Sequence, residues 1–358
     1  MYGNHKVSYQ PRNTGLSLQT RPATRRRVGA RNTSPVMMTL ISGSLSSYDD
    51  PMVRKIDPAP AVFNALRVFH AVIGLALVVS PATMLSVAYN VSPGNTLVYC
   101  LAVMLGAIHV YASVFSHALK SASENGRLYS NTYQRLAFGL GAWSFASMVK
   151  IAFLSSGSAQ LSAISSNVYA ALFAFTLGAQ FVCAKGQQIS FVSWNPLRLN
   201  VMENVYGFGT MFAFLGTLAV WLQYFCPESL LGTQLGSLSW IHAPAGALGK
   251  ELIHFISTGG FMLISAFTVL LDASQRGRLG ASTFKVLNLG TGLVSLLWGI
   301  CLYRMFNDGT MTNLVFGEVF ANLASYKAHL MDIFTYKASL IFPLLGVACF
   351  VQYLIAKK

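Results

Sequence analysis

Long, almost uniformly apolar stretches recur along the chain from about residue 66 to its end. Eight are present, at roughly residues 66–87, 96–119, 136–155, 165–184, 201–225, 248–271, 284–305 and 336–355. Each is close to the about 20 residues that a helix needs to cross the roughly 30 Å hydrocarbon core of a bilayer. A spanning β-strand would instead show about ten residues of alternating polarity. The pattern therefore predicts an all-α polytopic membrane protein with about eight transmembrane helices.

The composition favours lipid rather than water as the solvent of the outer surface. Hydrophobic residues make up 54% of the chain and charged residues only 10%, whereas a soluble domain carries about 25% charged residues. The net charge of +14 would suggest nucleic-acid binding in a soluble protein, but no soluble domain is predicted. We expect the lipid bilayer and other membrane subunits as partners, and no nucleic acid. The five cysteines lack CxxC spacing, so neither a disulfide framework nor a metal site is predicted.

The first 48 residues differ from the rest of the chain. They contain no Asp or Glu, and their seven basic residues are Lys6, Arg12, Arg21, Arg25, Arg26, Arg27 and Arg31. Such a composition, without the apolar core of a secretory signal, is typical of an organellar transit peptide. Gly and Pro residues in the first twenty positions disfavour an amphipathic helix, so a plastid membrane (envelope or thylakoid) is favoured over the mitochondrial inner membrane. The alternative is a disordered cytosolic tail.

The charged loops alternate along the predicted spans. One side of the membrane holds Arg54, Lys55, Lys120, Arg127, Arg135, Lys185, Arg198, Arg276, Arg278, Lys285, Lys357 and Lys358. The loops 88–95 and 156–164 on the other side carry no charge. This asymmetry is what the positive-inside rule predicts. Both termini are therefore expected on the basic side, which is the stroma, matrix or cytosol.

An internal repeat is visible at an offset of 151 residues. Residues 122–144 and 273–295 are identical at ten of 23 positions without a gap. Weaker matches join residues 66–74 to 199–207. We therefore predict two tandem four-helix repeats in the same orientation. The expected segments are a disordered transit-like stretch (1–48), a linker (49–65), a first repeat (66–184), a basic-side linker (185–200) and a second repeat (201–358).

Ionisable residues inside predicted spans are candidate site residues. His70 and Glu203 occupy matching positions of the two repeats, so one hypothesis is a His–carboxylate pair that faces across the repeat axis and binds a polar solute or protons. The alternative is two interfacial side chains that reach for water. His109 lies at the middle of its span and is either a neutral, hydrogen-bonded core residue or a ligand of haem or chlorophyll. No second histidine is predicted at its depth, which disfavours a bis-histidine haem.

Two further groups complete the candidate residues. Glu251 and His254 lie three positions apart at the start of the sixth span and form either a polar vestibule or a helix-end anchor. Arg127 and Arg278 occupy equivalent positions in the repeat, where they either belong to a packing signature or contact a phosphate or lipid headgroup. No catalytic residue or metal ligand is predicted, and no cofactor is required.

Two functions rank almost level from the sequence. The first is a small-solute transporter or channel, because fused repeats with a site at their interface are a common transporter design. The second is a non-catalytic membrane subunit or assembly factor of a photosynthetic or respiratory complex, which short loops and few intramembrane charges fit. A lipid- or pigment-modifying enzyme comes third, because the candidate residues include no catalytic set.

Overall fold

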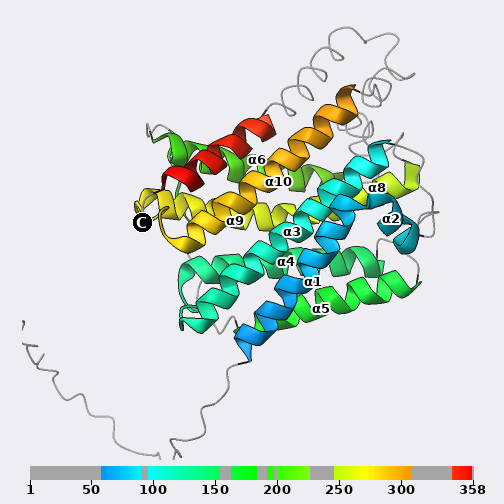
Figure 1. Cartoon of the computed structure of the whole chain (residues 1–358), viewed down its shortest axis with the longest axis horizontal. Coiled ribbons are helices and arrows are strands. Elements are labelled where there is room, and N and C mark those ends of the chain that lie inside the picture. Colours follow the sequence, from blue (N-terminus) through cyan, green and yellow to red (C-terminus); the bar gives the residue numbers. More distant parts are fainter. Residues whose placement is uncertain are drawn as a thin grey trace, which may run out of the picture. The chain divides into compact units, whose positions relative to one another are not determined.

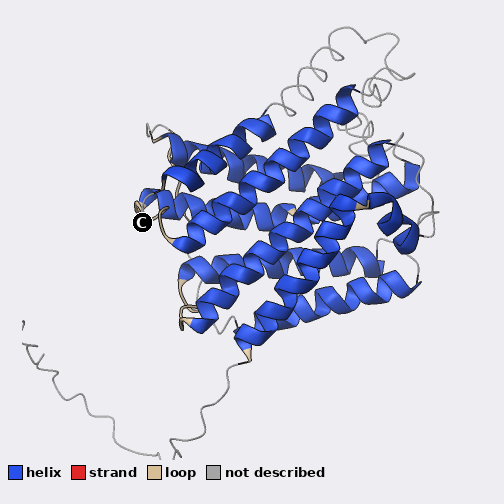
Figure 2. Ribbon diagram, in the orientation of Figure 1, coloured by secondary structure: helices blue, strands red, loops and turns tan. Residues whose placement is uncertain are grey.

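The computed structural model of the chain describes residues 58–89, 96–153, 163–183, 192–196, 200–225, 246–307 and 341–356. The predicted transit-like segment, residues 1–48, lies outside these ranges, as does most of the predicted linker 185–200. Within the described ranges the regular secondary structure is helical, without strands, and turns or loops join the helices (Figure 2).

The chain folds into helices joined by turns and loops (Figure 1). The helices are α1 (Ala59–Val79), α2 (Pro81–Tyr89), α3 (Thr96–Glu124), α4 (Asn131–Phe153), α5 (Ala163–Cys183), α6 (Val201–Phe225), α8 (Gly246–Thr258), α9 (Gly260–Gln275), α10 (Ser282–Asn307) and a last helix, Ile341–Ile355. A helix or a pair of helices lies on each of the apolar stretches. Within the described residues, four runs are long and apolar enough to cross a membrane: Ala59–Val79, Thr96–Glu124, Glu251–Gln275 and Ser282–Met305. The chain is therefore an all-α protein with the helices of a membrane protein.

The first helix differs from the predicted span 66–87 at both ends. It begins at Ala59, so residues 59–65 are helical rather than part of a linker. Pro58 and Pro60 stand at its N-terminus, where proline is well tolerated because the first backbone N–H groups have no helical partner. The helix ends at Val79 because Pro81 disfavours the helical conformation of Ser80, whose φ and ψ are −136° and 63°. The new boundaries move His70 from the edge of its helix to the centre.

The two faces of α1 show that its surroundings are apolar on both sides. Phe63, Leu66, His70, Gly74 and Leu77 are buried against the other helices. Large apolar side chains also cover the outer face, and these are Val68, Phe69, Val72, Leu75 and Val79. A contiguous apolar face of this kind would be unfavourable in water and is expected of a helix that faces lipid.

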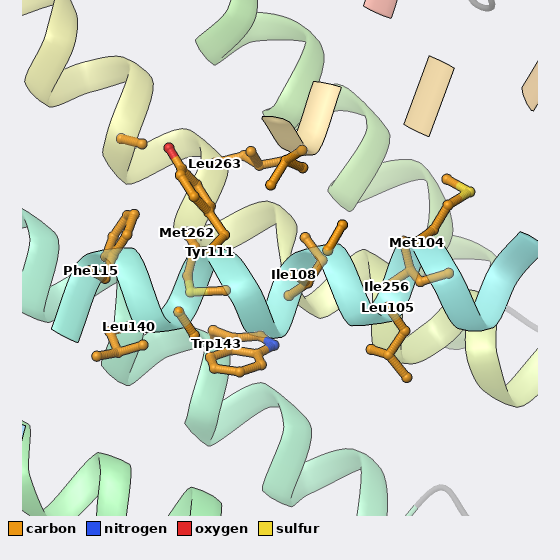
Figure 3. Packing of buried hydrophobic residues seen from close by; sticks show 14 of the residues in the cluster. Met104, Leu105, Ile108, Tyr111, Phe115, Leu140, Trp143, Ile256, Met262 and Leu263 are labelled. Atoms are coloured by element: carbon orange, nitrogen blue, oxygen red, sulfur yellow. The ribbon is translucent and has the colours of Figure 1, made fainter. Parts of the chain in front are cut away.

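Helix α3 lies at the centre of the packing and contacts α1, α4, α8 and α10. Figure 3 shows side chains of α3, including Ile108 and Tyr111, among Trp143 of α4 and Met262 of α9. Tyr111, Ile108 and Trp143 are almost fully buried. The Tyr111 hydroxyl also hydrogen-bonds Thr291 of α10 over 2.6 Å. Such interhelical hydrogen bonds and close packing hold helices together in lipid, where no hydrophobic force acts between them.

The same turn ends α3 and α9. Gly126 and Gly277 have φ values of 63° and 62°, a left-handed conformation that glycine adopts without steric cost. Behind each glycine, the amide of an arginine donates to the carbonyl five residues earlier: Arg127 to Ala122 and Arg278 to Ala273, both over 2.8 Å. This is the Schellman C-cap. A 2.8 Å hydrogen bond between Tyr133 and Thr283, at the starts of α4 and α10, brings the two turns to the same end of the helices.

Candidate functional site

Two histidines lie together inside the helices. The Nδ1 atoms of His70 (α1) and His109 (α3) lie 3.2 Å apart, and both side chains are almost completely buried. Each lies near the centre of its helix. An ionisable residue at that depth is costly unless it is paired, and it is by default a candidate for a functional site.

A glycine crossing next to the pair brings α1 and α3 together. A Cβ added to Gly74 would lie 2.7 Å from the amide nitrogen of Val110, and one added to Gly106 would lie 2.8 Å from the carbonyl oxygen of Gly74. Only glycine at both positions allows the two backbones to approach this closely. Gly74 follows His70 by one helical turn, and Gly106 precedes His109 by about one turn, so the crossing sets the distance between the two imidazoles.

The hydrogen bonds around the pair favour one arrangement of the hydrogens on the ring nitrogens. Thr176 of α5 donates its single hydroxyl hydrogen to the carbonyl of Leu172 over 2.8 Å. Its oxygen therefore accepts from Nε2 of His70, 3.3 Å away. A neutral His70 then has a bare Nδ1, which accepts from Nδ1–H of His109, and a neutral His109 keeps its lone pair on Nε2. The network thus ends in a hydrogen-bond acceptor.

Aromatic rings enclose the two histidines. The Trp143 ring lies 5.2 Å from that of His70 and 5.3 Å from that of His109, between ring centroids. The rings of Tyr169 and Phe173 of α5 lie 5.9 and 6.3 Å from the His109 ring. Within the described residues, the hydrogen bonds of the two imidazoles run to each other and to Thr176, and none runs to a carboxylate. Apolar walls without a counter-charge favour the neutral form of both rings.

A small cavity adjoins His109. It has a volume of about 20 Å³, and it is lined by Leu77, Leu85, Ala88, Tyr89, Leu105, His109, Tyr169, Leu252 and Phe255. About 10–15 Å³ suffices for one water molecule. His109 uses Nδ1 for His70, so Nε2 is the nitrogen left for a molecule in the cavity. The walls are otherwise apolar, apart from the two tyrosines.

Glu251 at the start of the span Glu251–Gln275 forms an ion pair with Lys150 at the end of α4. Lys150 is almost fully buried, and its Nζ lies 5.5 Å from the centre of the Phe255 ring. Because Phe255 also lines the cavity, the ion pair lies next to this site. The two opposite charges neutralise each other there, and the pair links α4 to α8.

The remaining sequence candidates lie on other elements than the histidine pair. Glu203 of α6 is buried and accepts a hydrogen bond from Asn200 over 2.9 Å. The histidine of the hypothetical His70–Glu203 pair forms its hydrogen bond with His109. His254 is buried on α8. The side chains of Arg127 and Arg278 are exposed beside their turns, where their backbone amides complete the helix caps.

Sequence reasoning missed the partner of His109. The prediction that no second histidine lies at the depth of His109 was wrong. The helix start predicted at residue 66 placed His70 near the membrane interface, whereas the helix begins at Ala59. Pro58 and Pro60, which mark the true helix start, were the available signal. The ion pair between Arg135 of α4 and Asp272 of α9, with 3.4 Å between the atoms, was also missed, since no sequence spacing relates residues so far apart.

A haem or chlorophyll does not fit at His109 in this arrangement. The cavity holds a water-sized molecule only, and the ring nitrogen on the other side is occupied by His70. Among the described residues, no group of three or more His, Cys, Asp or Glu side chains is placed to hold a metal ion.

Fold and site together define a helical membrane protein with a buried histidine pair beside a small cavity. Comparison of the chain with protein-family models, with curated proteins and with solved structures finds no match.

Proposed function

We propose that this protein is a small-solute transporter or channel of an organellar membrane. The observation that carries the proposal is the His70–His109 pair, because hydrogen-bonding groups buried at the centre of apolar helices mark solute and ion pathways in membrane proteins. The adjoining cavity supplies space for a solute. Its apolar and aromatic walls surround a few convergent polar groups, which is the usual composition of a small-molecule site.

Eight spans arranged as two like-oriented four-helix repeats are the proposed architecture. Packing around the glycines supports it. A Cβ on Gly139 of α4 would lie 2.3 Å from that of Ser265 of α9, and a Cβ on Gly290 of α10 would lie 3.0 Å from Cγ1 of Val114 of α3. The two contacts are equivalent under the repeat, because Gly290 and Ser265 lie 151 residues after Gly139 and Val114. The equal Schellman turns at Gly126 and Gly277 support the same relation.

The proposed location is a plastid membrane, with both termini on the stromal side. The acid-free, basic composition of residues 1–48 supports a transit peptide. Sidedness is supported by the two turns that carry Arg127 and Arg278, because the Tyr133–Thr283 hydrogen bond holds them at one end of the helices. Basic residues at one end of a helix set indicate the side that is not translocated.

An uptake assay tests the transporter proposal. The full chain, reconstituted in liposomes, is expected to take up at least one member of a panel of small labelled solutes faster than protein-free liposomes. His70→Leu should lower that rate at least about tenfold, because it removes a hydrogen bond of the network and leaves its buried partners unpaired. Glu203→Gln should retain uptake, since Glu203 bonds Asn200 rather than the pair. Uptake indistinguishable from that of protein-free liposomes for every solute would refute transport.

The alternative is a non-catalytic subunit of a photosynthetic or respiratory complex. One observation favours it: the cavity at His109 admits only a water-sized molecule, so a larger solute would need the helices to move. Co-migration of the protein with a large complex on a native gel, together with no uptake in liposomes, would decide for this alternative.

A further inference from the structure

The chemistry of the cavity beside His109 narrows the solute of the proposed transporter. The network from Leu172 through Thr176 and His70 leaves Nε2 of His109 as an acceptor. A molecule bound there must therefore donate a hydrogen bond. This excludes anions and solutes that have acceptors only.

Size and charge restrict the solute further. The cavity volume of about 20 Å³ accommodates a molecule with one heavy atom or little more. Leu77, Leu85, Leu105 and Leu252 form apolar walls, and a charged molecule would lose its hydration against them at high cost. Glu251, the nearby carboxylate, is already neutralised by Lys150. A cation therefore finds no counter-charge at the cavity among the described residues.

We propose that the solute is an uncharged hydrogen-bond donor of the size of water, and that it donates to Nε2 of His109. This inference rests on the proposed transport function. Water and ammonia share this chemistry. The phenol groups of Tyr89 and Tyr169 line the same cavity and can accept or donate the solute's remaining hydrogen bonds. The aromatic rings of Trp143 and Phe173 enclose the pair and keep its surroundings apolar.

Stopped-flow measurements on proteoliposomes of the full chain distinguish the two molecules. An osmotic step followed by light scattering reports water, and an ammonium chloride step followed by an internal pH dye reports ammonia. We expect at least one rate to exceed that of protein-free vesicles, without an ammonium or rubidium current. His109→Leu should reduce the protein-dependent rate at least about tenfold, the effect of one lost hydrogen bond.

Two further variants separate a lost site from a lost fold. Ala88→Phe fills the cavity from α2 and leaves both histidines in the chain, so it should reduce the same rate. His117→Leu is the matched control, because His117 lies on the same helix but is exposed and contacts Arg67; it should leave the rate unchanged.

The outcomes distinguish this inference from the transporter proposal. If neither water nor ammonia permeates faster than in protein-free vesicles while a larger or charged solute is taken up, the inference fails and transport stands. The same holds if His109→Leu and Ala88→Phe both leave the rates unchanged. If no solute of any kind crosses, both proposals fail.

Discussion

Replacing Gly106 by leucine is expected to destabilise the protein and to abolish the proposed transport activity. A Cβ at this position would lie 2.8 Å from the carbonyl oxygen of Gly74 and 2.9 Å from Cβ of Leu77. Since the backbone of α1 cannot yield locally, α1 and α3 must separate. Overpacking of this kind costs about 1–3 kcal/mol or more, which corresponds to a fall in Tm on the order of 5 °C for a chain of this size. Separation of the helices also breaks the His70–His109 hydrogen bond.

Thermal unfolding of the detergent-solubilised protein measures the effect of Gly106→Leu. Gly178→Leu on α5 is the matched control, because nothing lies within 4 Å of a Cβ added there. Its Tm should match or exceed that of the unchanged protein, since leucine is a better helix former than glycine by about 0.5–1 kcal/mol. Equal Tm values for the two variants would contradict the close crossing of α1 and α3.

Lys150→Met is expected to cause the second large loss of stability. It removes one partner of a buried ion pair and leaves Glu251 with a side chain only 15% exposed. Breaking such a pair costs about 3–5 kcal/mol, whereas replacing both partners by apolar residues is often neutral. The double variant Lys150→Met with Glu251→Met should therefore regain most of the Tm that the single variant loses.

The control for Lys150→Met is Lys120→Met. Lys120 pairs with Glu124 on the surface of α3, where the two side chains are 26% and 47% exposed. An exposed pair contributes about 0–1 kcal/mol, so this variant should unfold within about 2 °C of the unchanged protein. A loss as large as that of Lys150→Met, or a double variant no more stable than the single one, would contradict a buried pair between α4 and α8.

The helical class of the fold could be predicted from the sequence, because long apolar stretches leave few alternatives once lipid is the solvent. The boundaries were harder to predict. Apolar residues lie on both sides of Ser80 and Pro81, so hydrophobicity alone predicts one continuous helix in place of α1 and α2. The backbone break depends on proline chemistry, which hydrophobicity does not register.

The candidate site shows where sequence reasoning ends. The depth of His109 follows from its position in a long apolar helix, and that is why it was a candidate. Its pairing with His70 depends on the crossing of α1 and α3 at Gly74 and Gly106. Helix crossings arise from side-chain packing between segments distant in sequence, and a single sequence carries no direct signal of them. The ion pairs of α4 with Glu251 and Asp272 could not be predicted from the sequence for the same reason.

The claim that lipid solvates the outer faces of the helices can be tested directly. Membranes from cells that express the full chain are washed with alkaline carbonate and centrifuged at high speed, and the chain is followed in pellet and supernatant. Because apolar side chains such as Phe69, Val72 and Val79 cover the outer face of α1, we expect the chain to stay in the pellet until detergent is added. A chain that remains dissolved after the wash, without detergent, would contradict its solvation by lipid.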